Sequence, residues 1–238
     1  MSKAQNPSRH WGCHFSIALV FLAVGCAPAL IPIDREEMAR LKNEPEIRVV
    51  TYPPPRFLYQ TPLQPFGGLG PGAFNPVTGV FVGQGGDPRS QVYAIDTSLA
   101  DPVIQVKDLF LNGLAGHLGS ARLVQSGEPL PDDDVKALAK RFGGGVVLDF
   151  QTTTWGLLSG QSMSKPYQIA YLARARLVRL DAGRVLWQGQ CQYDGRDPGG
   201  NLDTFETSLD IVGKKFAEAA HACAKTLLAQ FLNNPSRP

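Results

Sequence analysis

Val146-Val147-Leu148-Asp149-Phe150-Gln151-Thr152-Thr153-Thr154-Trp155 is the stretch that sets the fold class of this chain. It is rich in β-branched and aromatic residues, and Val146, Leu148 and Phe150 alternate onto one face. This composition and this period of two predict a half-buried β-strand. Asp149 falls on the opposite face, where a charged side chain needs either solvent or a partner.

Two further strands are predicted directly after it, over residues 167–178 and 185–193. Asp181-Ala182-Gly183-Arg184 joins them, and Gly183 can adopt the positive φ that a tight hairpin turn needs. In the last strand one face is expected to carry Val185, Trp187, Cys191 and Tyr193, and the other Gln188, Gln190 and Gln192. Arg174 and Arg176 could form a cross-strand ion pair with Asp149, but we favour the interpretation that these charges are simply solvated.

Helices are predicted before and after these strands along the chain. Asp101-Pro102 is a strong helix start, and a stripe at three- and four-residue steps follows it, made of Val103, Val106, Phe110, Leu114 and Leu118. A second helix begins after Asp132-Asp133-Asp134, buries Val135, Leu138, Ala139 and Phe142, and stops at Gly143-Gly144. We interpret the three acids as helix caps and not as a metal site, because consecutive residues on one turn do not converge on an ion.

A long helix is predicted from about residue 204 to residue 232. Its buried stripe is expected to contain Phe205, Leu209, Val212, Phe216, Ala220, Cys223, Leu227 and Phe231. With shorter strands over residues 47–52 and 121–124, the chain is predicted to be a single α/β (α+β) domain. We expect a mixed, largely antiparallel sheet with about three packed helices.

Residues 53–91 form a Gly/Pro-rich insert in this domain, and Pro53-Pro54-Pro55 should end the first strand. The insert keeps apolar residues, among them Phe66, Leu69, Phe74 and Phe81. A loop this long is uncommon unless it is functional or disordered. We regard these four residues as a candidate contact loop, with a packed surface loop or disorder as the alternatives. Its glycines lack the strand and helix that a dinucleotide site requires.

The N-terminus carries a targeting signal. Lys3 and Arg9 precede the apolar run of residues 15–24, which is too short to span a bilayer and suits a signal peptide. Leu22-Ala23-Val24-Gly25-Cys26 resembles the lipidation box of bacterial lipoproteins, in which the cysteine becomes the acylated (palmitate-bearing) N-terminus. The resemblance implies cleavage after residue 25 and, because Ala27 and not Asp follows Cys26, the periplasmic face of the outer membrane. An ordinary or uncleaved signal is the alternative. Residues 26–46 are expected to form a lipidated tether, and residues 233–238 a tail.

Charge and cysteine content follow from this cleavage. The chain has 23 basic and 21 acidic residues, and the signal removes two basic residues and no acid, so the mature chain is formally neutral. That balance does not favour nucleic-acid binding. Cys13 leaves with the signal and Cys26 carries lipid, so Cys191 and Cys223 remain. Each is predicted on a buried face of adjacent elements, which suggests a disulfide in the oxidising periplasm, with two free buried thiols as the alternative.

No catalytic constellation is recognisable. The mature chain has only His117 and His221, no ligands at zinc spacing and no Gly-x-Ser-x-Gly motif, and Ser159, Ser162 and Ser164 are expected in a polar loop. We therefore expect no enzymatic activity, no cofactor and no metal. We consider three hypotheses for the function of the chain, and the weakest is a hydrolase whose catalytic triad is dispersed along the sequence. A serine-reactive fluorophosphonate probe would test it.

Residues 100–232 are similar to a periplasmic α/β domain. The similarity consists of a helix, a glycine stop, the strand Val146–Phe150, and a hairpin that ends in Gly183-Arg184-Val185-Leu186-Trp187-Gln188-Gly189. That domain is shared by the curli-secretion lipoprotein, the lipoprotein activators of penicillin-binding proteins and the amino-terminal domain of the Tol translocation protein. The resemblance implies a non-enzymatic envelope protein that binds another envelope protein or assembles with itself. The other hypothesis is an accessory subunit or carrier for a lipid or small apolar ligand.

Overall fold

The computed structural model describes residues 30–60, 73–75, 80–82, 92–95, 97–119, 121–162, 165–193 and 209–233. Its helices are α1 (Arg35–Lys42), α2 (Pro102–Leu114), the short 3₁₀ helix η1 (Ala115–His117), α3 (Val135–Phe142) and α4 (Leu209–Leu232). Its strands are β1 (Glu46–Thr51), β2 (Phe57–Gln60), β3 (Ala73–Asn75), β4 (Val80–Val82), β5 (Val92–Ile95), β6 (Arg122–Gln125), β7 (Val146–Ser162), β8 (Lys165–Arg179) and β9 (Arg184–Tyr193).

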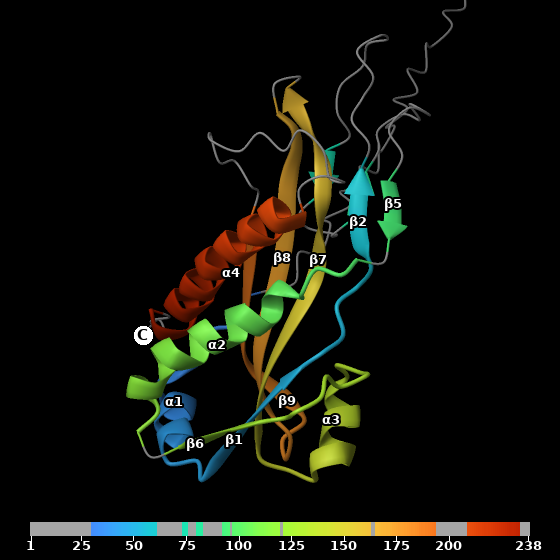
Figure 1. Cartoon of the computed structure of the whole chain (residues 1–238). Helices are drawn as coiled ribbons and strands as arrows, with labels where there is room; N and C mark the ends of the chain where they lie inside the picture. Colours follow the sequence, from blue (N-terminus) through green and yellow to red (C-terminus); the bar gives the residue numbers. More distant parts are fainter. Residues whose placement is uncertain are drawn as a thin grey trace, which may run out of the picture.

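Seven of these strands form one mixed sheet (Figure 1). β7, β8 and β9 make an antiparallel meander, and this confirms the predicted hairpin around Gly183, whose φ is +58°. β1 lies between β6 and β7 and is parallel to both. β2 is parallel to β7 and antiparallel to β5, while β3 and β4 pair separately. The predicted α/β class with a mixed, largely antiparallel sheet is confirmed.

β1 and β2 follow each other along the same edge of β7. The register joins Thr51 to Phe150 and, after the three prolines, Leu58 to Gly156. The prolines interrupt the ladder as predicted, because they have no N–H to donate. The indole N–H of Trp155 crosses the gap and donates to the carbonyl of Pro55 at 2.7 Å. β2 then approaches so closely that a Cβ at position 156 would lie 2.1 Å from the carbonyl oxygen of Leu58, so this position needs glycine.

Helices cover both faces of the sheet (Figure 1). Val146, Leu148 and Phe150 belong to the larger core with residues of α1, α2 and α4, whereas Val147 belongs to a second core under α3. The predicted alternation along β7 is therefore confirmed, but both faces are buried in this part of the strand. α2 and α4 lie side by side, and a side chain at Gly113 would collide with Leu228 of α4.

The predicted helix signals around α2 and α3 are confirmed. The five stripe residues of the first helix are all buried: Val103, Val106, Phe110, Leu114 and Leu118. Asp101 caps α2, and Asp134 caps α3 by accepting from the N–H groups of Lys136 and Ala137. α3 ends at Gly143, which has a φ of +78°. Its apolar face packs as expected, with Leu138 buried and the other three predicted residues partly buried.

The expected tether over residues 26–46 is contradicted from residue 30 onward. Ile31 pairs with Gln188 of β9, Ile33 and Leu41 are buried in the larger core, and α1 packs on the domain. The polar composition of α1 suggested a solvated segment. Met38 and Leu41 nevertheless pack in the larger core, and Glu37 pairs with Arg179 and Arg184 of the β8–β9 hairpin.

Three local predictions are also wrong. Val185 packs into the smaller core while Leu186 and Trp187 both face the larger one, because the register shifts between Leu177 and Val178 of β8 and places an extra residue in β9. Leu209, predicted in the buried stripe, is 42% exposed at the first position of α4, whereas Val212 one turn later is fully buried. Ser159 and Ser162 belong to β7 and not to a loop, because β7 and β8 continue as a long hairpin.

Candidate functional site

A pocket of about 400 Å³ opens between α2 and α4 near their N-terminal ends. Its apolar lining comes from Leu99, Pro102, Ile104, Leu109, Phe216 and Ala217, and its polar lining from Asp101, Gln105, Asp108 and Asn112. The two helices run side by side from the same end of the sheet, as Figure 1 shows. The pocket is therefore built on rigid elements, and its volume lies in the range of small-ligand and side-chain sites.

One rim residue of this pocket is an exposed aliphatic side chain, because Ile104 is 42% exposed. Leu209 and Ile211, on the first turn of α4, are 42% and 45% exposed and do not line the pocket. With Leu30 these are the large apolar residues that are strongly exposed in the described part of the chain. We call the pocket lining, Ile104 included, the α2–α4 groove. An apolar pocket with an exposed aliphatic rim is a candidate contact surface.

Asp101 is a lining residue of the groove that also caps α2. Its Oδ1 accepts hydrogen bonds from the N–H of Val103 at 3.0 Å and from the hydroxyl of Thr152, which approaches the hydroxyl of Tyr171. Burial raises the pKa of Asp101, and the bonds from Thr152 and Val103 oppose that shift. Oδ1 of Asp101 is thus engaged by the protein itself, and the groove offers mainly apolar contacts to a ligand.

A second candidate cluster surrounds Asp149, which is fully buried on the face under α3. Arg176 binds both of its oxygens, with an Nη2–Oδ2 distance of 2.7 Å, and the hydroxyl of Tyr52 donates to Oδ2 at 3.0 Å. Arg176 also donates to the carbonyl of Asp133, whose carboxylate pairs with Arg174. Burial, and then the negative charge of Asp149, raise the pKa of Tyr52.

The expectation that Asp149 and Arg176 are separately solvated is therefore wrong. They lie opposite each other in the β7–β8 register, and α3 covers them. Their hydrogen-bonding groups are satisfied within the network, which joins β1, β7, β8 and the start of α3. The arrangement is that of a structural tie between elements, and it leaves no open position for a substrate.

The predicted disulfide is confirmed. Cys191 of β9 and Cys223 of α4 are bonded, and their Cα atoms lie 5.2 Å apart. Both are buried, so the bond fastens the last helix to the edge of the sheet. Nearby, the side-chain amide of Gln230 accepts from the N–H of Gln190 and donates to its carbonyl, at 3.0 and 2.9 Å. The bond and this pair of hydrogen bonds hold the same two elements together.

The structure describes only some of the remaining predicted site residues. Cys26, Phe66 and Leu69 lie outside the described residues. Phe74 and Phe81 are register partners in the β3–β4 ladder, so the backbone brings these two positions of the candidate contact loop together. The lipidation site and the contact role of the loop stay predictions.

The α2–α4 groove was missed from the sequence. Ile104 lies off the predicted stripe of its helix and forms no pattern of its own. The available signal was an isoleucine on the predicted exposed face of a helix. In the part of the chain that the structure describes, no three His, Cys, Asp or Glu side chains gather as metal ligands do. Within those same residues, no helix has the length and apolarity to cross a bilayer.

Comparison with known proteins assigns no family to the chain. No family model matches it, and no curated protein matches it. Among solved structures, the PelC dodecamer from Paraburkholderia phytofirmans is 12% identical over 79% of this chain and 86% of that chain, with a TM-score of 0.34. Protein XCC0632 from Xanthomonas campestris is 12% identical over 85% and 86%, with a TM-score of 0.38.

Lipoprotein GNA1162 from Neisseria meningitidis is 24% identical over 36% of this chain and 57% of that chain, with a TM-score of 0.21. All three TM-scores are below 0.5. We therefore draw neither fold nor function from these likenesses.

Proposed function

We propose that this chain is a lipid-anchored protein of the bacterial cell envelope that acts by binding an apolar segment of another protein, or of its own copies, in the α2–α4 groove. The anchor is the lipidated Cys26, and the address is the periplasmic face of the outer membrane. The signal sequence and the lipidation box support the anchor, and Ala27 supports the address. The resemblance of residues 100–232 to domains of envelope lipoproteins that bind other envelope proteins supports the same role.

The exposure of Ile104 at the rim of an apolar pocket carries this proposal. Removing apolar surface from water stabilises a complex by about 25 cal/mol for each Å² that is covered. A partner side chain seated between α2 and α4 would cover Ile104 and fill the pocket. Buried anchors of this type supply most of the affinity in protein interfaces.

The volume of the pocket favours a second candidate, a carrier of a small apolar ligand or lipid chain. About 400 Å³ lies within the usual range for such sites, and most of the lining residues are apolar. Both candidates place the occupant in the same groove. They differ in whether a protein or a small molecule is bound there.

A single substitution tests both candidates. Ile104→Asp places a charge at the rim of the groove, and it should remove a crosslinked partner or a defined oligomer from intact cells without altering the unfolding midpoint. Leu30→Asp is the matched control, because Leu30 is also a strongly exposed aliphatic residue (58%) and does not line the groove. Native mass spectrometry separates the outcomes: a partner or oligomer lost in Ile104→Asp supports the first candidate, and co-purified lipid lost in the same variant supports the second. Unchanged complexes and no bound lipid would reject the groove as the site.

Absence of catalysis is part of the proposal. Both oxygens of the buried Asp149 bind Arg176, and Oδ1 of the partly buried Asp101 accepts two hydrogen bonds from the protein, which favours structural roles for both carboxylates. Labelling of a serine by a broad fluorophosphonate probe would contradict this part. The address is tested separately with Cys26→Ser, which should release the protein from the membrane fraction.

A further inference from the structure

The segment that follows the proposed anchor is fastened to β9. The N–H of Ile31 donates to the carbonyl of Gln188 at 3.1 Å, and the N–H of Gln188 donates back to the carbonyl of Ile31 at 2.9 Å. Two residues later, Ile33 enters the larger core. The chain is therefore attached to the edge of the sheet at residue 31, well before the first strand begins.

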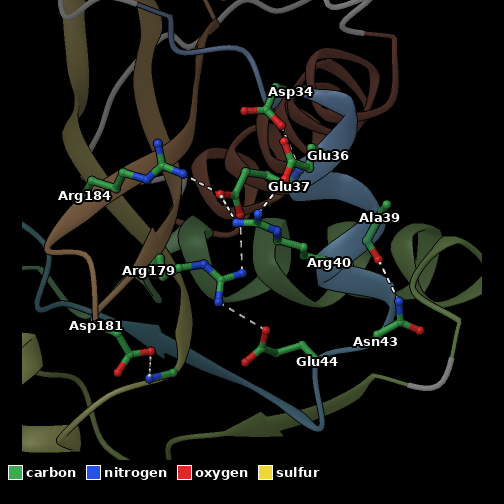
Figure 2. A network of polar contacts seen from close by, with 11 residues as sticks. Asp34, Glu36, Glu37, Ala39, Arg40, Asn43, Glu44, Arg179, Asp181 and Arg184 are labelled. Carbon is green, nitrogen blue, oxygen red and sulfur yellow. Dashed lines mark hydrogen bonds and ion pairs between the residues drawn. The ribbon is translucent and has the colours of Figure 1, made fainter.

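Glu37 fixes the next part of this segment (Figure 2). Its carboxylate, almost fully buried, forms ion pairs with Arg179 and Arg184 of the β8–β9 hairpin and with Arg40 of its own helix. Arg179 also pairs with Glu44, at 3.3 Å. Asp34 caps α1 by accepting from the N–H of Glu37 at 2.7 Å. Several charges converge on a buried carboxylate here, so α1 cannot lift off the hairpin without leaving those charges unpaired.

The distance from the lipid anchor to the folded domain is consequently short. Ile31 follows Cys26 by five positions, and a fully extended chain over five Cα–Cα steps spans at most about 18 Å. A tether that ended at Glu46 would instead span up to about 72 Å. The attachment of Ile31 thus reduces the reach of the anchor roughly fourfold, whatever conformation the intervening residues adopt.

We propose that the edge of the sheet formed by β9, with residues 30–37 beside it, is the side of the protein that faces the lipid bilayer. This inference rests on the lipidation of Cys26 that the proposed function includes. β6 forms the opposite edge, four strand spacings away through β1, β7 and β8, which is about 19 Å at the usual spacing. The anchored segment is attached at the β9 edge and not at the β6 edge.

The composition of the β9 side agrees with a bilayer as the neighbouring surface. Leu30, the most exposed of the large apolar residues described, lies directly before the attachment point. Gln188 and Gln190 have their outward backbone groups taken by Ile31 and by the amide of Gln230. A strand of another protein therefore cannot extend the sheet at these positions, whereas a lipid surface needs no backbone partners.

Site-specific photocrosslinking to lipid tests the orientation in the full-length, processed protein. p-Benzoylphenylalanine is incorporated in place of Gln192 of β9 or, as the matched control, in place of Gln125 of β6. Both are exposed glutamines on edge strands. The purified protein is reconstituted into vesicles of phosphatidylethanolamine and phosphatidylglycerol and irradiated. Intact-protein mass spectrometry then counts phospholipid adducts and reads the acylation of Cys26. We expect several-fold more adducts at position 192 than at position 125.

A second variant tests whether the short tether causes that difference in adduct yield. A flexible Gly/Ser segment of about 20 residues inserted between Ala27 and Pro28 lengthens the tether and should reduce the difference between the two positions. Equal adduct yields in acylated protein without the insertion would overturn the orientation and leave the lipoprotein assignment intact. An unmodified Cys26 would overturn both the address and the orientation.

Discussion

Asp149 of β7 and Arg176 of β8 lie directly opposite each other and form an ion pair inside the protein, where the carboxylate has no contact with solvent. Tyr52, from the loop after β1, donates to the same carboxylate. Separate segments of the chain thus converge on one buried negative charge. The pair therefore connects β1, β7 and β8, and its loss should destabilise the whole domain.

Arg176→Met removes the positive partner and leaves Asp149 charged in the interior. We expect a loss of about 3–5 kcal/mol in the free energy of unfolding, because a buried charge without its partner is strongly unfavourable. Arg122→Met is the control, since its pair with Glu46 is largely exposed and should contribute only about 0–1 kcal/mol. Urea unfolding of both variants measures the difference. Similar small losses in the two variants would show that Asp149 finds solvent or another partner.

Asp101→Asn should be at least as stable as the natural protein at neutral pH. The amide oxygen can still accept from Val103 and Thr152, and asparagine caps helices as well as aspartate does. Burial raises the pKa of Asp101 above the usual 3.8, so its charged form costs folding free energy at neutral pH.

That cost disappears as the pH falls through the raised pKa toward 3.8, so the advantage of asparagine should shrink in acid. Asp101→Ala removes the cap itself and should lose about 0.5–2 kcal/mol. Urea unfolding of the three proteins across the acid range measures both effects. An advantage of asparagine that grows on acidification would contradict the sign of the pKa shift.

Removal of the Cys191–Cys223 disulfide should destabilise the domain. The two cysteines are 32 residues apart, and closing a loop of that length stabilises by roughly 3–4 kcal/mol in the chain-entropy estimate. The double variant Cys191→Ala/Cys223→Ala should therefore unfold at lower urea concentration. Reductant should lower the midpoint of the natural protein and leave that of the double variant unchanged. An unaltered midpoint of the natural protein in reductant would contradict the prediction.

Gln230→Leu should weaken the contact between α4 and β9. It leaves both the N–H and the carbonyl of Gln190 without their partners, and the expected loss is about 1–3 kcal/mol. Gln230→Glu keeps the acceptor and loses the donor, so its effect should be intermediate. Hydrogen exchange at the amide of Gln190 reports the local change. Gln125→Leu, at an exposed hydrogen bond on β6, serves as the control, and an equal effect there would argue against a specific role.

Much of the fold was predictable because it depends on short-range patterns. Alternation identified β7, three- and four-residue steps identified α2 and α4, and Gly183 identified the hairpin. The disulfide followed from the same reasoning, since Cys191 and Cys223 each occupied the apolar face of neighbouring elements. The α2–α4 groove was not predictable, because a pocket between two helices depends on how they pack and not on the local pattern of either one.

By itself the sequence determined the class of the fold, the identity of most elements and the faces that they bury, because these follow from the local spacing of apolar and polar residues. The tertiary structure alone decided which charges meet, as for Asp149 and Arg176. It also decided that Ile31 attaches to β9 and that β2 resumes along β7 after the prolines. Such pairings join residues far apart in the chain, and the free energy of each contact depends on neighbours that no local pattern contains.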